Sequence, residues 1–360
     1  MSPNDWDVGY ILPNVSLTQA FEAPYIALVP HNDTRLIKIK SSVRGCDKLL
    51  NCFIDQANKK VEPSIIIVDR QAPKKVWTDE ALVAFRNSIA MAVILRNWAE
   101  VDPNSSPGGP LFSDFFDFYP YTLGADGVFV ALNPALSSIY SSSAKFVGMS
   151  APHLPHLFKR SFTVDENLLI PLLLFWKLRF ASPGKDDRIS RVLFRSIEMA
   201  YHALSTPIKN QSTLHDYGIS LAEWVSAFEI LAHPKNATVD VTVVMNLLEG
   251  FSWNDNRLKY RRYVAKIGRT KKYRVNLICR LYKDIYDARN TFLHGNPVTD
   301  RVIYPFGKKS LPSLWQLAPV IYRVALMAFL ERHVKRKRPG LIYPFIESHY
   351  EDCFLQMIDS

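Results

Sequence analysis

Apolar residues recur at spacings of three and four through most of the second half of the chain. Leu277, Leu281, Ile285, Ala288 and Phe292 form one such series, which predicts an amphipathic helix over 275–293. The same pattern predicts helices over 165–179, 187–204, 220–232, 239–248 and 311–334. Five or six helices with connections of modest length are typical of a helical bundle.

The first part of the chain has a mixed pattern. Short β-branched or alternating runs at 25–29, 36–39 and 64–68 predict strands, and Thr78 caps a predicted helix that continues to about Trp98. We therefore expect an α+β protein in three parts. Residues 1–160 form a mixed α/β domain, residues 161–340 a helical bundle, and residues 341–360 a C-terminal tail.

Composition is that of a soluble globular protein, with 48% hydrophobic and 22% charged residues. The longest uninterrupted apolar run, 168–176, is far shorter than the roughly 20 residues that a membrane-spanning helix needs. The first residues do not resemble a secretory signal, so we expect a cytoplasmic protein with no membrane partner. Four cysteines without a C-x-x-C pair suggest free thiols, and neither a metal site nor a nucleotide-binding loop is evident. We expect no cofactor.

Positive charge is concentrated in one quarter of the chain. The net charge is +10, yet residues 251–340 hold 21 basic and 5 acidic residues. Such a block attracts polyanions, which makes nucleic acid the first partner to consider, although a basic face kept for solubility is the alternative. Its densest part has tyrosines interleaved, a composition suited to binding phosphates and stacking bases. The candidate substrate-binding residues are Arg257, Lys259, Arg261, Arg262, Lys266, Arg269, Lys271, Lys272 and Arg274.

The helix predicted over 275–293 ends in a group of residues that could carry chemistry. Asn290 and His294 are four apart and share a face, Arg289 lies beside them, and Gly295 follows at the helix stop. An imidazole can move protons near neutral pH, a guanidinium can hold a phosphate, and an amide can orient either. These residue types suit RNA cleavage by the ribose 2′-hydroxyl, which needs no metal and leaves a 2′,3′-cyclic phosphate and a 5′-hydroxyl.

One imidazole cannot easily serve as base and acid together. A homodimer that brings two such helix ends together would supply both groups. The structural alternative is that Arg289 pairs with Asp284, Asp287 or another bundle carboxylate, while His294 only caps the helix.

The sequence 289–295, RNTFLHG, resembles the R-[polar]-x-x-x-H motif of HEPN-domain ribonucleases. Residues 221–231 and 285–295 are similar to the ApeA-like branch, and the likeness spans about 185–335. The resemblance implies a dimeric helical bundle with a metal-independent RNase site. In it Arg289 would engage the scissile phosphate, Asn290 would orient it and His294 would be the catalytic imidazole. Glu229 would form an ion pair with Arg289 or another base rather than transfer a proton.

The resemblance also implies a biological setting. Such proteins act in antiviral defence or toxin systems, and extensions like residues 1–160 sense a trigger, such as a phage-derived one, or hold a regulatory protein. Two hypotheses follow. The chain is an RNA endonuclease, or it is a non-catalytic RNA-binding or regulatory module built on the same bundle.

Overall fold

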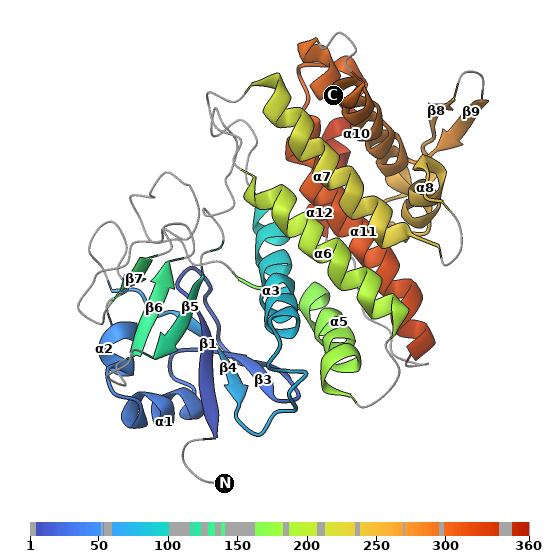
Figure 1. Cartoon of the computed structure of the whole chain (residues 1–360). Coiled ribbons are helices and arrows are strands. Elements are labelled where there is room, and N and C mark those ends of the chain that lie inside the picture. Colours follow the sequence, from blue (N-terminus) through green and yellow to red (C-terminus); the bar gives the residue numbers. More distant parts are fainter. Residues whose placement is uncertain are drawn as a thin grey trace. The chain divides into compact units, whose positions relative to one another are not determined.

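The computed structural model combines an N-terminal strand region with a largely helical C-terminal half (Figure 1). The structure describes residues 5–51, 53, 60–100, 116, 118–123, 129–133, 138–140, 163–182, 187–206, 213–234, 238–268, 271–294, 299–337 and 348–359. The chain divides into two compact units. Unit 1 comprises Met1–Asn97 and Leu111–Asp187, and unit 2 comprises Trp98–Pro110 and Arg188–Ser360.

Unit 1 contains an antiparallel sheet of seven described strands in the order β2-β3-β4-β1-β5-β6-β7. The strands are β1 (Trp6–Leu12), β2 (Phe21–Ala23), β3 (Ile26–Val29), β4 (Ser64–Asp69), β5 (Tyr119–Leu123), β6 (Phe129–Asn133) and β7 (Ser138–Tyr140). Four consecutive residues of β4, from Ile65 to Val68, are fully buried. Burial on both faces explains why this strand is a continuous apolar run. The strands expected at 25–29 and 64–68 are confirmed.

The helical parts of unit 1 are α1 (Thr34–Ser42), α2 (Cys46–Leu50), α3 (Asp79–Glu100), α5 (Glu166–Trp176) and a π-helical turn, η1 (Lys177–Ala181). The last three residues of α3 belong to unit 2. The strand expected at 36–39 is wrong, because these residues lie within α1. Leu36 and Ile39, three apart, are the buried residues of α1, and the Asp33 side chain accepts a hydrogen bond from the Arg35 backbone. Helical spacing and an N-cap therefore outweigh the β-branched composition.

The domain boundary expected at residue 160 lies outside the described residues. The two units divide between Asp187 and Arg188, so α5 belongs to unit 1 together with α3. The Trp176 indole donates a hydrogen bond to the carbonyl of Ala81, which fixes α5 to the start of α3.

Unit 2 is formed mainly of helices. They are α6 (Arg188–Ser205), α7 (Leu214–Ala232), α8 (Val241–Glu249), α9 (Asn256–Tyr260), α10 (Leu277–Leu293), α11 (Leu314–Lys337) and α12 (Ser348–Asp359), with 3-10 turns η2 (Asp300–Ile303) and η3 (Pro305–Gly307). The predicted helices are confirmed with small shifts at their ends. Part of the expected tail is instead helix α12, and the basic segment contains an unexpected hairpin, β8 (Tyr263–Ile267) and β9 (Lys271–Val275).

Helix α11 forms much of the core of unit 2. Its segment Leu314–Val334 is long and apolar enough to cross a membrane by length and composition, but 89% of its most apolar window is buried within the protein. Such burial is typical of the core helix of a soluble protein. The Tyr322 hydroxyl of α11 lies 2.6 Å from the Ser196 hydroxyl of α6, and the Tyr322 ring packs on Trp224 of α7.

Candidate functional site

Helix α10 carries the predicted catalytic residues at its C-terminal end. The Asn276 side chain caps its start by accepting from the Cys279 backbone, and His294 leaves helical geometry at φ −96° and ψ 10°. Leu281, Ile285 and Ala288 are buried. Packing of this stripe fixes the helix and leaves the opposite flank partly exposed.

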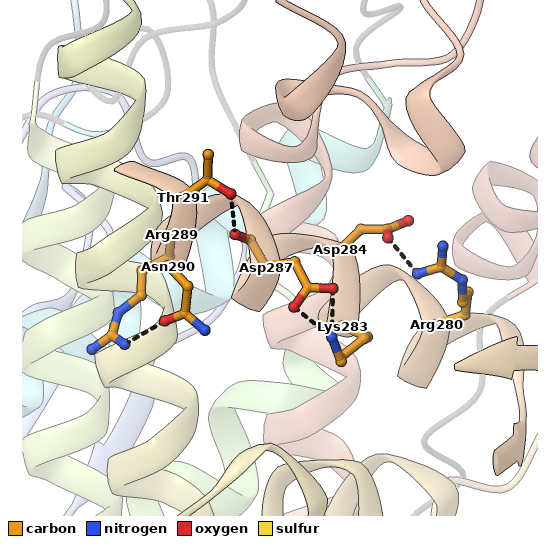
Figure 2. Close-up of polar contacts among 7 residues, drawn as sticks. All are labelled: Arg280, Lys283, Asp284, Asp287, Arg289, Asn290 and Thr291. Atoms are coloured by element: carbon orange, nitrogen blue, oxygen red, sulfur yellow. Dashed lines mark hydrogen bonds and ion pairs between the residues drawn. The ribbon is translucent and has the colours of Figure 1, made fainter. Parts of the chain in front are cut away.

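Arg289 and Asn290 contact each other on that flank (Figure 2). Nη1 of Arg289 donates to Oδ1 of Asn290 at 2.9 Å, and the guanidinium lies 5.9 Å from the centre of the Tyr286 ring. Both residues are half-buried, whereas the following His294 is exposed. The Nε atom of Arg289 is buried without a hydrogen-bond partner. The arrangement holds a cation and an amide together one turn before an accessible imidazole.

The nearby carboxylates of α10 already have other partners. Asp284 pairs with Arg280 and also accepts the backbone N–H of Phe306, and Asp287 pairs with Lys283. Figure 2 shows these pairs as separate from Arg289 and Asn290. The alternative in which Arg289 pairs with Asp284 or Asp287 is therefore wrong. Within the described ranges, no carboxylate forms an ion pair with Arg289.

Glu229 of α7 approaches this group without joining it directly. Partial burial raises the pKa of its carboxyl, and the positive charge of Arg289 opposes that rise. The ion pair expected between Glu229 and Arg289 or another base is not formed among the described side chains. Burial raises the pKa of Glu229 by more than the charge of Arg289 lowers it, because the two side chains do not form an ion pair.

Two tyrosines of α10 belong to the same region and were missed at the sequence level. The Tyr282 hydroxyl is buried without a hydrogen-bond partner, and burial raises its pKa well above the ordinary value, with Glu229 adding to the effect. Tyr286 lies three residues before Arg289, and its ring centre is 6.4 Å from that of Tyr282. The signal that could have identified both is helical spacing, because Tyr286 lies three residues before Arg289 and Tyr282 four residues before Tyr286.

The basic segment places its cations in two different settings. Arg257 and Arg262 are held in ion pairs with Asp255 and Glu249. Lys259 lies over the ring of Tyr260, and Arg261 donates to the carbonyl of Ile358 at 3.3 Å. The remaining described candidates are exposed on the hairpin, namely Lys266, Lys271, Lys272 and Arg274. Arg269 and Gly295 lie outside the described residues.

The two parts of the candidate site are attached to opposite ends of α10. Strand β9 ends at Val275, just before the helix starts, and His294 follows its last residue. A helix of 17 residues is about 25 Å long. The chain thus separates the base of the hairpin from the Arg289 region by one helix length.

Thiols and metal ligands add no second centre in the part of the chain that the structure describes. Cys46, Cys279 and Cys353 are free, and Cys52 lies outside the described residues. Burial raises the pKa of the Cys46 thiol to about 12. Within the described ranges, no group of three or more His, Cys, Asp or Glu residues is arranged to hold a metal ion.

No family model, curated protein or solved structure matches the chain.

Proposed function

We propose that unit 2 is a metal-independent RNA endonuclease of the HEPN type. The observation that carries the proposal is the contact of Arg289 with Asn290 on a half-buried flank, beside an exposed His294, with no described carboxylate paired to the guanidinium. A cation that is not neutralised by a carboxylate remains available to a phosphate.

The proposed reaction is attack of the ribose 2′-oxygen on the adjacent phosphorus. The 2′-O–P bond forms while the P–O5′ bond breaks, the 2′-hydroxyl proton goes to a base and the leaving 5′-oxygen takes a proton from an acid. His294 supplies an imidazole for one of these transfers. Arg289, which has five N–H donors, stabilises the charge that develops on the phosphate oxygens, and Asn290 orients the guanidinium. DNA lacks the attacking hydroxyl and is not cleaved.

A second copy of the chain would supply the second imidazole. Three apolar side chains at the end of α10 and the start of α7 are exposed, with exposed fractions of 56% for Leu293, 37% for Leu214 and 43% for Ile219. The close contact of Gly218 with Phe292 brings the start of α7 to the end of α10, so these side chains lie near one another. An apolar surface of this kind favours a homodimer interface that joins two active sites.

Substitution of His294 tests the proposal. We expect His294→Ala to lower RNA cleavage by about 10²–10⁴-fold, the usual contribution of a general acid or base, while RNA affinity stays nearly unchanged. Cleavage by the unmodified protein should be insensitive to EDTA and should leave 2′,3′-cyclic phosphate ends. His202→Ala, which removes an exposed imidazole of α6, is the matched control and should retain activity.

The alternative function is a non-catalytic RNA-binding or regulatory module. The observation that favours it is the separation of the exposed hairpin cations from His294. Intact RNA after incubation with the dimeric protein, together with normal RNA binding, would support this alternative.

The proposed setting is antiviral defence or a toxin system in the cytoplasm, with unit 1 sensing a trigger or holding a regulatory protein. A latent nuclease would need that trigger. Growth arrest on expression, relieved by His294→Ala, is the measurement that detects activity inside cells when the purified protein is silent.

A further inference from the structure

The hairpin β8–β9 gathers cations on one of its faces. Lys266 is the cross-strand partner of Lys272, and Val264 is the partner of Arg274. Cross-strand partners share a face, as do residues two apart along a strand. These four side chains therefore lie on one face of the hairpin, which we term the cationic face.

The cationic face points into solvent. All four of its residues are exposed, and Val264 has 55% of its surface accessible. On the other face Ala265 and Val275 are buried. Figure 1 shows the hairpin projecting from the helical bundle beside α8 and α10. The other face is thus partly buried, whereas the cationic face is open to a partner.

The charges of this face are not compensated within the described part of the chain, where no carboxylate pairs with Lys266, Lys272 or Arg274. Three other exposed cations of unit 2 do have carboxylate partners: Arg257 pairs with Asp255, Arg262 with Glu249 and Lys309 with Asp300. Like charges directly opposite each other destabilise a sheet. The placement of Lys266 opposite Lys272 thus opposes folding, and a bound polyanion would relieve the repulsion.

We propose that the cationic face binds the phosphate backbone of single-stranded RNA and holds the strand that Arg289 and His294 cleave. This inference rests on the proposed function for its link to cleavage. Lys272 and Arg274 are two residues apart, about 6.8 Å along a strand, a spacing comparable with that of consecutive phosphates. Tyr260, which precedes the hairpin and is 66% exposed, offers a ring on which an unpaired base stacks. Tyr273 shares the opposite face of the hairpin with Ala265.

The length of α10 adds a requirement on the substrate. An RNA held at the hairpin of the same protomer must continue across about 25 Å, the length of α10, to reach its C-terminal end. RNA of only a few nucleotides cannot contact both regions, so we expect its cleavage to be insensitive to the hairpin cations.

The test compares two triple variants in the His294→Ala background, which prevents cleavage during the measurement. One carries Lys266→Gln, Lys272→Gln and Arg274→Gln, and the control carries Arg301→Gln, Lys308→Gln and Lys309→Gln, which are exposed and lie outside the candidate substrate-binding set. Both variants lose three exposed positive charges, but only the first loses them from the cationic face. Binding of a labelled single-stranded RNA of about 30 nucleotides is measured over a series of salt concentrations.

We expect the hairpin variant to bind more weakly and its slope of log K against log salt to fall by about 2, since each phosphate contact with a single strand contributes about 0.7. The control should keep the slope of the parent. Equal effects of the two variants would mean that overall charge alone matters and would overturn the inference. Tighter binding of a duplex of the same length would contradict the preference for single strands.

Cleavage assays with His294 restored separate this inference from the proposed function. We expect the hairpin variant to show a raised KM and an unchanged kcat on the long RNA. If no variant cleaves RNA while the difference in binding persists, the proposed nuclease fails and the RNA-binding face stands. If cleavage is normal in both triple variants and their RNA binding is alike, the hairpin inference fails and the nuclease stands.

Discussion

At the scale of single residues, Glu229 has the most informative environment of the candidate site. Its carboxyl is half-buried in α7, and burial raises its pKa above the ordinary value of 4.5 despite the charge of Arg289. The folded protein therefore holds this proton more tightly than the unfolded chain does. By linkage, the contribution of Glu229 to stability is fully present below pH 4.5 and is lost as the pH rises through the folded-state pKa.

Glu229→Gln tests that environment. The amide keeps the shape of the side chain but cannot ionise, so we expect the variant to melt at a higher temperature than the parent near pH 7. Near pH 4, where the parent carboxyl is mostly protonated, the two melting temperatures should agree. Thermal unfolding over a pH series provides the measurement. A lower melting temperature of the variant at neutral pH would show that the ionised carboxylate stabilises the fold through Arg289.

The sequence predicted part of this residue-scale arrangement. A spacing of four placed Asn290 and His294 at one helix end, and the chain neighbours Arg289 and Asn290 do form a hydrogen bond. The partners of Asp284 and Asp287 could not be predicted. Asp284 pairs with Arg280 and Asp287 pairs with Lys283, in each case the basic residue four positions earlier on the helix. These pairs compete with ion pairs that the same carboxylates could form with Arg289.

At the scale of elements, α7 and α10 approach closely where the candidate site lies. A Cβ atom placed on Gly218 would come within 2.5 Å of Cγ of Phe292. The glycine therefore lets the ring pack directly on the α7 backbone. This contact positions the last turn of α10, which carries Asn290 and leads into His294.

Gly218→Ala should disturb that last turn more than it unfolds the protein. Overpacking costs about 1–3 kcal/mol, and the better helix propensity of alanine returns about 1 kcal/mol, so the net loss of stability should be small. Cleavage should fall clearly, because displacement of Phe292 moves His294. Denaturant midpoints and initial cleavage rates measure the two effects. In a Phe292→Ala background the effect of Gly218→Ala on cleavage should be smaller. An effect of the same size in both backgrounds would rule out this contact as the cause.

Local pattern predicted helices better than short strands. The long apolar series of α6, α7 and α10 are clearly helical, whereas the four residues at 36–39 fit the period of a helix and that of a strand equally well. The hairpin was missed because its open face is charged and its strands lack the alternation of a half-buried sheet. Its short apolar contacts, Ala265 and Val275, are too few to form a recognisable pattern.

At the scale of the whole molecule, α12 completes the core of unit 2. The Glu351 carboxylate accepts the backbone N–H groups of Asn254 and Asp255, and the buried Phe354 ring lies 5.8 Å from that of Trp253. These contacts join the end of the chain to a segment about a hundred residues earlier. The sequence predicts a tail at 341–360, because one short amphipathic stretch does not reveal the distant partner that it covers.

Phe354→Ala measures how much α12 contributes. Truncating a fully buried phenylalanine costs about 3–5 kcal/mol, a large share of the 5–15 kcal/mol that stabilises a typical domain. We expect the midpoint of denaturant unfolding to fall accordingly. Asp352→Ala, on the exposed side of the same helix, should change stability by less than about 0.5 kcal/mol. A loose tail would leave the midpoint unchanged in both variants.

The end of α3 bears on how unit 2 can be handled in isolation. The Trp98 indole donates to the carbonyl of Gln316, its ring packs edge-on against Trp315, and the carbonyl of Ala99 accepts from the Cys353 thiol. A fragment that starts at Arg188 would lack Trp98 and Ala99 and would leave a tryptophan-sized gap beside α11. Contacts between residues more than two hundred positions apart in the sequence also slow folding, because the intervening chain must form a closed loop before these contacts can stabilise the fold. Recombinant work on the helical half should therefore retain the stretch from Trp98, or supply it as a separate peptide.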